Sequence, residues 1–375
     1  MFQRLFITAA MPALAGLLAF APPAHADPGN ADRQECAVWP DWDRFRQQFV
    51  SADGRIVDRS IPQQVTTSEG QSYALMFALI ANDRAAFDLI LRWTENNLAD
   101  GDLTGRLPAW QWGQRTDGSW GVIDSNAASD ADLWIAYALN EAGRLWSVPG
   151  YTALAELLAA RILREETAEL PGLGLALLPG PQGFHPDDIT WRLNPSYMPI
   201  QILRRLAGAY PESRWDELIA TSLATITRSA QDGLVPEWIT YRTGKGFIAD
   251  SGATAAGVGF NAIRVYLWAG MLDKRDAASP ELLKALAPLG QRVAEKGTVG
   301  ENSTAGFSSA LLPFLKTSGL EQALRQQRQR TVALARPERT DNYYNRVLTL
   351  FGLGWLEGRY RFDRNGQLLP EWKCA

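Results

Sequence analysis

Histidine and cysteine are scarce in this chain, which has two of each among its 375 residues. One histidine, His25, falls in an N-terminal segment that we expect to be removed. The other, His185, lies in the Pro- and Gly-rich stretch PGPQGFHPDD, and we interpret it as a surface-loop residue. The sequence has no HExxH motif, three-histidine set or Cys/His cluster, so the usual zinc sites are excluded.

Motifs for nucleophilic and nucleotide chemistry are absent as well. The sequence has no G-x-S-x-G turn, no phosphate-binding loop ending in GK[ST] and no dinucleotide fingerprint. Its formal net charge is −4, so the composition does not indicate the basic surface that binds nucleic acid. If the chain is an enzyme, carboxylates are therefore the best candidates for its proton chemistry.

Only the N-terminus carries a long apolar run. Residues 1–26 combine Arg4, an apolar stretch broken by Pro12 and a final Ala-His-Ala, a pattern typical of a secretory signal peptide. No later run reaches the roughly 20 residues of a transmembrane helix. We predict an exported protein, periplasmic or secreted, whose mature chain has a net charge of −5 because Arg4 is lost.

The two cysteines, Cys36 and Cys374, lie near opposite ends of the mature chain. In an oxidising compartment they could form a disulfide that ties the termini together, and we favour this pairing. The alternative is two independent thiols, which spacing alone does not exclude.

Helical periodicity dominates the rest of the chain. Apolar residues recur at i, i+3 and i+4 through most of eleven segments. These are 71–81, 84–98, 131–147, 151–166, 197–209, 214–229, 261–272, 280–295, 307–316, 319–329 and 342–356. Only short pieces such as 234–242 look extended. With no repeat of fixed period to indicate a solenoid, we predict that residues 27–375 form a single all-α domain, a barrel of helix pairs.

Three of the predicted helices begin with polar residues of chemical interest. In TTSEGQSYALMF, Ser68 and Gln71 are spaced as a capping box, which places Glu69 in the first turn beside Gly70. An acid at a helix start also complements the helix dipole, which is the simpler interpretation. That interpretation does not explain Gly70, a poor helix former that would let another group, such as a substrate, approach closely.

The second start, DSNAASDADLWIAY, offers Ser129 as a cap and gathers Asp124, Asp130 and Asp132 near the aromatic residues of the following helix. For Asp132 alone, dipole complementarity suffices as an explanation. The third start, GVGFNAIRVYLW, has Asn261 in a favoured capping position. Carboxylates that face one another across an aromatic cleft are the layout of a glycosidase.

At this point the chain resembles glycoside hydrolase family 8, particularly the members encoded with bacterial cellulose synthase. The resemblance covers nearly the whole mature chain. It includes the stretches TTSEGQSYALMFALIANDRAAFD, RLPAWQWG, DSNAASDADLWIAYALNEAGRLW, WRLNPSYMP, NAIRVYLWAGM and YYNRVLTLFGLGW. The run ASDADLW fits the family's signature of paired aspartates that enter a helix.

The resemblance implies an (α/α)6 barrel that cleaves β-1,4-glucan internally with inversion and needs no metal or organic cofactor. It implies that Glu69 is the general acid and that Asp130 is essential at the cleavage subsite. The same matches suggest substrate contacts at Trp110, Trp112, Asp132, Trp191, Tyr197, Arg264 and Tyr344. A partner is implied too, the cellulose synthase export complex, beside the glucan itself.

One match departs from the family pattern. The cellulose-associated members normally carry Tyr-Asp where this chain has Phe260 and Asn261, and that Asp is the expected catalytic base. A neutral amide can orient a water molecule but does not accept its proton. An engineered knock-out and natural divergence both fit, and the accompanying change at Phe260 favours divergence. Asp130, Asp250 and Glu237 are the candidate substitute bases.

Three functions therefore stay open at this point. The first is an exported endo-β-1,4-glucanase linked to cellulose production. The second is a catalytically impaired, glucan-binding relative, because Asn261 replaces the base. The third is a hydrolase of another β-1,4 polymer, such as chitosan or xylan.

Overall fold

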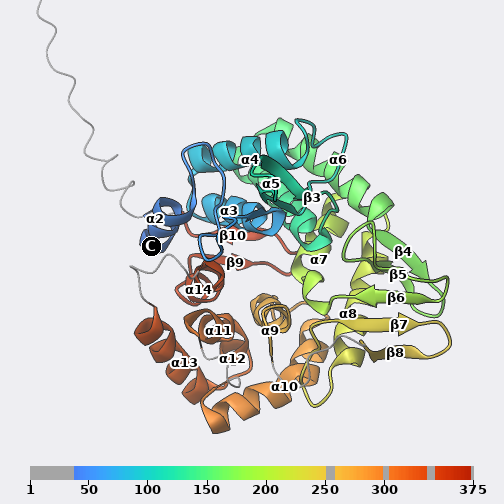
Figure 1. Ribbon diagram of the computed structural model, residues 1–375. Coiled ribbons are helices and arrows are strands. Elements are labelled where there is room, and N and C mark those ends of the chain that lie inside the picture. The colour runs from blue at the N-terminus through green and yellow to red at the C-terminus, as the bar shows by residue number, and fades with distance from the viewer. Residues whose placement is uncertain (1–37, 251–257, 299–303, 336–342, 373–375) are drawn as a thin grey trace, which may run out of the picture.

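Helices follow one another in pairs, in which one member is almost wholly buried and the next is exposed on one face (Figure 1). The computed structural model describes residues 38–250, 258–298, 304–335 and 343–372. The inner helices are α3 (Ser68–Ile80), α5 (Ser129–Trp146), α7 (Ile200–Ala209), α9 (Ala262–Met271), α11 (Ala305–Ala310) with α12 (Leu312–Thr317), and α14 (Tyr343–Leu356). The outer helices are α2 (Pro40–Phe49), α4 (Arg84–Leu98), α6 (Pro149–Glu165), α8 (Trp215–Ser229), α10 (Ser279–Lys296) and α13 (Glu321–Leu334). This arrangement is the expected (α/α)6 barrel.

The two rings differ in their sequence patterns. Every residue of α9, AIRVYLWAGM, is buried, and α3 is buried at all positions except Glu69. Helices that are apolar on all sides must be surrounded by protein. The outer helix α6 instead buries Ala155, Leu158, Ala159 and Ile162, which form one stripe at helical spacing. The sequence thus specifies which helix of each pair lies inside.

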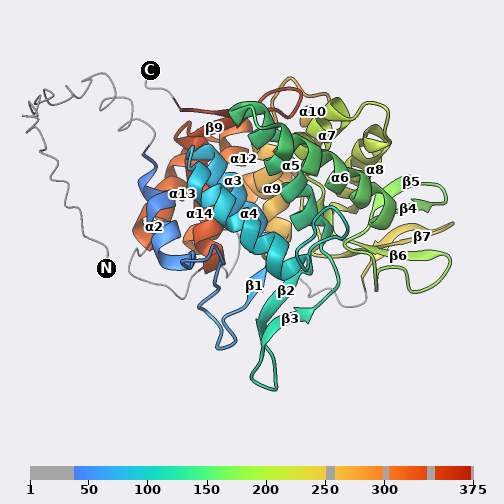
Figure 2. The same cartoon turned by 90° about the horizontal axis from the view of Figure 1, so that it is seen from above.

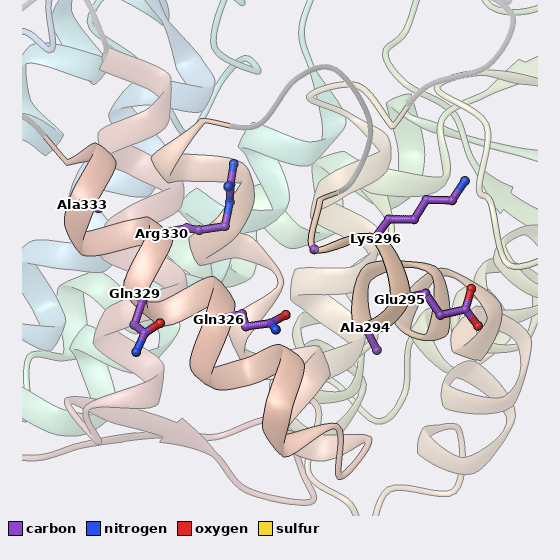
Figure 3. Close-up of a pocket in the computed structure, with 8 residues that line it drawn as sticks. Ala294, Glu295, Lys296, Gln326, Gln329, Arg330 and Ala333 are labelled. Atoms are coloured by element: carbon purple, nitrogen blue, oxygen red, sulfur yellow. The ribbon is translucent and has the colours of Figure 1, made fainter.

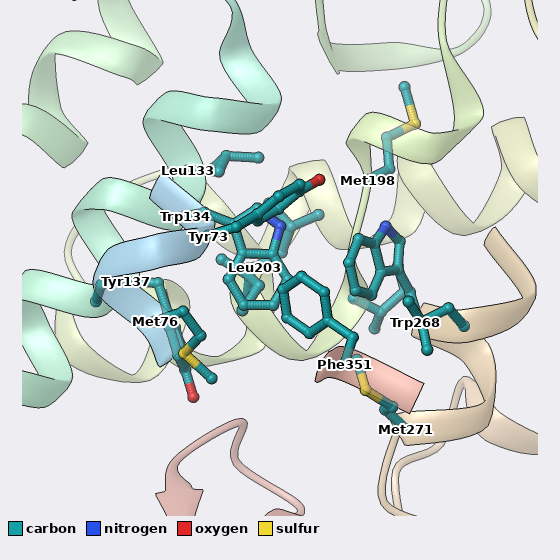
Figure 4. Close-up of a cluster of buried hydrophobic side chains, with 14 of the residues drawn as sticks. Tyr73, Met76, Leu133, Trp134, Tyr137, Met198, Leu203, Trp268, Met271 and Phe351 are labelled. Carbon is teal, nitrogen blue, oxygen red and sulfur yellow. The ribbon is translucent and has the colours of Figure 1, made fainter. Parts of the chain in front are cut away.

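Aromatic side chains fill the centre of the barrel (Figure 4). The ring of Phe351 in α14 lies 5.0 Å from Tyr73, 5.5 Å from Trp134 and 5.2 Å from Trp268, measured between ring centroids. Phe351 also contacts Phe77 of α3 at 4.6 Å. The last inner helix therefore packs against the first, and this contact closes the ring.

Short antiparallel sheets decorate the ends of the barrel. They comprise β1 (Thr66–Thr67), β2 (Gln111–Gln114) and β3 (Trp120–Asp124); β4 (Thr167–Leu170) and β5 (Gly174–Leu177); β6 (Thr190–Leu193), β7 (Ile239–Arg242) and β8 (Gly246–Ala249); and β9 (Tyr360–Phe362) with β10 (Leu368–Pro370). A short 3-10 helix, Pro195–Tyr197, precedes α7. Figure 2 shows that the sheet β1–β3 projects beyond the helices on one side of the barrel.

Most predicted helices are present with small shifts, and α4 has the predicted bounds. The sequence analysis missed α2, although Pro40 at its start and two acids in its first turn are helix-start signals. The predicted helix 307–316 is broken at Leu311, just before Pro313, into α11 and α12. The predicted strand character of 234–242 is confined to an isolated bridge at Leu234 and to β7.

The predictions that Ser68 and Ser129 are capping residues were wrong. The N-cap of α3 is Thr67, whose hydroxyl accepts a hydrogen bond from the Gly70 amide at 3.1 Å, while Ser68 is already helical. Gln71 does not complete a capping box, because its amide bonds the backbone of Ile56 and Gly54 instead. The N-cap of α5 is Ala128, and Ser129 makes no side-chain cap.

The proposed signal peptide, residues 1–26, and both cysteines, Cys36 and Cys374, lie outside the described residues. Within the described ranges, no helix combines the length and the apolar character needed to cross a membrane.

Candidate active site

The candidate acid, Glu69, lies in the first turn of α3, where β1 delivers the chain to the rim of the barrel. Its backbone neighbour Ser68 donates its amide to the carbonyl of Trp110 at 3.0 Å, which fixes the start of α3 beside β2. Gly70 follows, and a Cβ added there would overlap the hydroxyl of Tyr343. The close approach seen at Gly70 is therefore that of Tyr343 of α14.

All hydrogen bonds of the Glu69 carboxyl within the described chain use one oxygen. Oε1 accepts from the hydroxyl of Tyr344 at 3.0 Å, from the hydroxyl of Tyr73 at 3.3 Å and from Arg264. Oε2 is therefore the oxygen available to carry a proton into the cleft. Burial raises the pKa of Glu69 and the charge of Asp130 adds to this, whereas Arg264 opposes it. The net effect favours the protonated form that a general acid needs.

Arg264 of α9 is the centre of the site, with only 2% of its surface exposed. Its Nη1 donates to Glu69, to the Tyr73 hydroxyl at 2.9 Å and to Asp130 Oδ2 at 2.9 Å. Its Nη2 donates to the Asn261 side-chain oxygen at 2.6 Å and to the Ser196 hydroxyl at 3.0 Å. One guanidinium therefore fixes the positions of side chains from α3, α5, the N-cap of α9 and the 3-10 helix.

Asp130 is the second residue of α5, with 3% of its surface exposed. Its Oδ1 accepts from the amide of Ala131 at 2.8 Å, while Oδ2 is held by Arg264. Burial raises the pKa of Asp130, and Arg264 opposes that shift. Because Glu69 and Asp130 bond the same nitrogen, those two oxygens lie at most about 6 Å apart, two hydrogen-bond lengths.

Asn261 occupies the N-cap position of α9 but does not cap it with its side chain. The carboxylate of Glu237 does so instead, accepting from the amides of Asn261 at 3.1 Å and Ala262 at 2.9 Å. The side-chain oxygen of Asn261 is engaged by Arg264, so the group it can offer to the cleft is its NH2, a hydrogen-bond donor.

The side chains of Glu237 and Asp250, the other candidate bases, also make structural contacts. Glu237 caps α9 through both of its carboxylate oxygens. Asp250 pairs with Arg192 at 2.9 Å and accepts from the Thr240 hydroxyl at 3.3 Å, within the β6–β8 sheet. Neither residue is among those that line the cleft.

Most of the predicted site residues meet in one cleft of about 350 Å³. Its lining comprises Asp58, Thr67, Ser68, Glu69, Trp110, Ala128, Asp130, Tyr197, Phe260, Asn261, Arg264 and Tyr344. Five of these residues had no predicted role in the cleft: Asp58, Thr67, Ser68, Ala128 and Phe260. Asp58 lies in the loop between α2 and β1, where no motif marks it, and Phe260 had been noted only as a departure from the family pattern.

Three predicted substrate contacts, Trp191, Trp112 and Asp132, are not among the residues that line this cleft. Trp191 is 3% exposed and stacks under His185, with 4.7 Å between ring centroids. Trp112 packs edge-on against Trp93 of α4 at 5.3 Å. Asp132 is fully buried behind Asp130, where its carboxyl faces that of Glu166.

A second cavity, of about 500 Å³, lies between α10 and α13 (Figure 3). Its side chains include Glu295, Lys296 and Arg330 but no aromatic ring. It does not have the paired carboxylates and aromatic walls found in the cleft at Glu69. Within the described residues, no group of three or more His, Cys, Asp and Glu side chains could hold a metal ion.

Comparison with known proteins matches the sequence model described as Glycosyl hydrolases family 8 to residues 30–358. An endoglucanase from Xanthomonas axonopodis pv. citri (strain 306) is 45% identical, with 96% of each chain covered. An endoglucanase from Escherichia coli (strain K12) is 43% identical, covering 91% of this chain and 94% of the relative. The crystal structure of endo-1,4-D-glucanase from Vibrio fischeri ES114 superposes with a TM-score of 0.82 at 44% identity, covering 89% of this chain and 99% of that one.

Proposed function

Because the chain belongs to glycosyl hydrolase family 8 and is therefore a glycoside hydrolase, we propose that it cleaves β-1,4-glucan chains internally. One observation carries the proposal. Glu69, Asp130 and Asn261 converge on a single buried guanidinium inside a cleft that also contains Trp110, Tyr197, Phe260 and Tyr344. The relatives at 43–45% identity that bear the name endoglucanase support the same substrate class.

In this mechanism Glu69 donates the proton on Oε2 to the glycosidic oxygen as the bond to the leaving sugar breaks. Burial keeps the carboxyl protonated, and the three donors on Oε1 hold its orientation. Asp130 lies beside Glu69 and places negative charge near the cation-like transition state, because Arg264 fixes it at the same nitrogen. The aromatic walls stack on the sugar faces.

Inversion requires a second group that takes a proton from water, about 6.5–9.5 Å from the acid. The oxygens of Asp130 and Glu69 that bond the same nitrogen lie at most about 6 Å apart, which is below this range. Asn261 is bound through the other guanidinium nitrogen, at the sequence position where the resemblance to family 8 expects the base. Its amide, however, can only donate to the attacking water. We propose that water activation limits the rate of this enzyme.

The test compares wild type, Asn261→Asp and Glu69→Gln in the hydrolysis of carboxymethylcellulose, followed by release of reducing ends. We expect low activity in wild type and a gain in Asn261→Asp on the order of 10²–10⁴, the contribution of a general base. Glu69→Gln should lose the activity that remains. Wild-type turnover equal to that of the Asp-bearing relatives, with no gain in Asn261→Asp, would contradict the assignment of Asn261.

The Asn261 amide, which replaces the expected base, also favours a second candidate function. If Asn261 reduces hydrolysis enough, the protein acts mainly as a glucan-binding relative with the same cleft. Binding of long glucans without release of reducing ends would select this alternative. A panel of cellulose derivatives, chitosan and xylan tests the third possibility, because a chitosan or xylan hydrolase would release ends from its own polymer first.

We also propose that the protein is exported and acts on cellulose during its production, beside the cellulose synthase export complex. The leader-like sequence of residues 1–26 and the resemblance to members encoded with cellulose synthase support this proposal. N-terminal sequencing of protein from the periplasm or medium should begin at Asp27. A full-length chain confined to the cytoplasm would contradict it.

A further inference from the structure

Within the described chain, Trp120 and Phe260 are the aromatic side chains on the exposed hydrophobic surface, each with 46% of its area accessible. Phe260 lines the cleft. Trp120 begins β3, in the β2–β3 hairpin that projects from the sheet beside the start of α3 (Figure 2). The Trp120 indole therefore offers an exposed aromatic surface on this side of the barrel.

Trp120 has a built support on one face only. The Trp112 ring is offset-stacked on it, with 5.5 Å between centroids and 29° between planes. The Arg55 guanidinium lies 5.0 Å from the Trp120 ring centre and 4.5 Å from that of Trp112. Because Arg55 and Trp112 are this close together, both contact the Trp120 indole from the same side. The opposite face of the indole is free of both, and 46% of the residue's surface is exposed.

This support is fixed in place by the surrounding chain. Arg55 Nε donates to the Thr66 hydroxyl at 2.8 Å, and Nη2 donates to the backbone carbonyl of Gln64. Trp112 is held edge-on against Trp93, and the hairpin turn closes through the Arg115 amide and the Ser119 carbonyl at 2.8 Å. A ligand that stacks on Trp120 would therefore meet a rigid surface and lose little free energy to ordering it.

The platform is continuous with the cleft. Thr67 lines the cleft and pairs with Gln111 at the start of β2, immediately after Trp110, which also lines the cleft. Trp120 pairs with Gln114 at the far end of the same strand. The two points are three residues apart, or about 10 Å along a strand. A linear polymer lying in the cleft can therefore extend onto the hairpin.

We propose that the free face of Trp120 is a stacking site, outside the catalytic cleft, for the β-1,4-glucan chain that the cleft holds. This inference rests on the proposed function and deepens it, because it makes long chains better ligands than short ones. The C–H faces of sugar rings suit a single supported indole, as other aromatic contacts do. A protein partner would need a contact area near 1,000 Å² or more, which one indole does not supply.

The experiment measures affinity in a hydrolysis-blocked Glu69→Gln background, with hydroxyethylcellulose as the long ligand and cellotriose as the short one. Trp120→Ala should weaken binding of the polymer by about 2- to 10-fold, the range of one aromatic stacking contact. The affinity for cellotriose should stay the same. Trp120→Phe, which keeps an aromatic face, should recover part of the loss.

Leu157→Ala is the matched control, because Leu157 is an exposed apolar residue of α6, 50% accessible, outside the cleft lining. It should leave both affinities at the parent values. Equal affinity of Trp120→Ala and parent for the polymer overturns the stacking site alone. So does an equal loss for both ligands, which would indicate damage to the cleft. A parent that binds neither glucan overturns the proposed function as well.

Discussion

At the scale of single residues, the pKa of Glu69 is set by two opposing effects, three hydrogen-bond donors and burial. Tyr344 and Tyr73 donate to Glu69 Oε1, and Arg264 donates to the same atom. Each of these contacts stabilises the charged carboxylate and so lowers the pKa, while burial raises it. The protonated fraction of Glu69 at neutral pH therefore depends on groups that single substitutions can remove one at a time.

Tyr344→Phe should move the alkaline limb of the kcat/KM profile to higher pH. The hydrogen bond from Tyr344 lowers the pKa of Glu69, so its loss raises that pKa further, and the acid form persists to higher pH. The pH dependence of glucan hydrolysis in the active Asn261→Asp background measures the shift. Tyr343→Phe is the control, because no hydrogen bond joins the Tyr343 hydroxyl to Glu69 in the described chain. A limb that moves to lower pH would contradict this account.

The sequence predicted much of this site, but not how it is held together. Glu69, Asp130 and Asn261 each stand at a helix start within a motif, which is a local signal. Their common partner is not local: Arg264 reaches Glu69 across 195 positions of sequence. Asp58 was missed because it lies in a loop with no periodicity and no motif.

At the scale of elements, close helix packing decides which glycines can be replaced. Gly70→Ala should destabilise the protein by about 1–3 kcal/mol, because the added Cβ would overlap the Tyr343 hydroxyl in an otherwise closed contact. Gly208→Ala in α7 is the matched control, since no atom lies near its added Cβ, and it should stabilise by up to about 1 kcal/mol. Denaturant unfolding of both variants measures the difference. Stabilisation of both would show that the Tyr343 contact yields easily.

The helices could be predicted from the sequence and the rim strands could not, for a physical reason. A helix such as α4 repeats its apolar positions over 15 residues and begins after Asp83, which caps it by accepting from the Ala86 amide. The strands β1 to β3 span two to five residues each, too few for a period of two to be distinguished from chance. The capping errors at Ser68 and Ser129 shifted helix starts by one residue, within the usual uncertainty of boundaries.

At the scale of the whole molecule, a buried pair of carboxyls joins an inner helix to its outer partner. Asp132 in α5 and Glu166 at the end of α6 are both fully buried, and neither has a basic partner among the described residues. Their carboxyls interact with each other and with Asp130, an arrangement that favours the sharing of a proton between the two. Dipole complementarity, the simpler explanation from sequence, does not account for a buried Asp132 opposite another acid.

This pair should make the folded state less stable as the pH rises. Burial raises the pKa of Asp132 and of Glu166 well above their ordinary values of 3.8 and 4.5, and the charge of Asp130 adds to both shifts. Above about pH 4 the unfolded chain releases these protons while the folded chain retains them. The slope of unfolding free energy against pH is then negative, up to about 1.4 kcal/mol per pH unit for each proton.

Asp132→Asn removes one titrating group and should make that slope less negative between about pH 5 and pH 7. Glu166→Gln should have the same effect, because either change ends the sharing of a proton. The double variant should change the slope by less than the sum of the two, as expected for groups in contact. Unfolding free energies from urea titrations across the pH range give all four slopes. A slope in both single variants equal to that of wild type would mean that the pair is already ionised in the folded protein, and the barrel would then need another cation at this point.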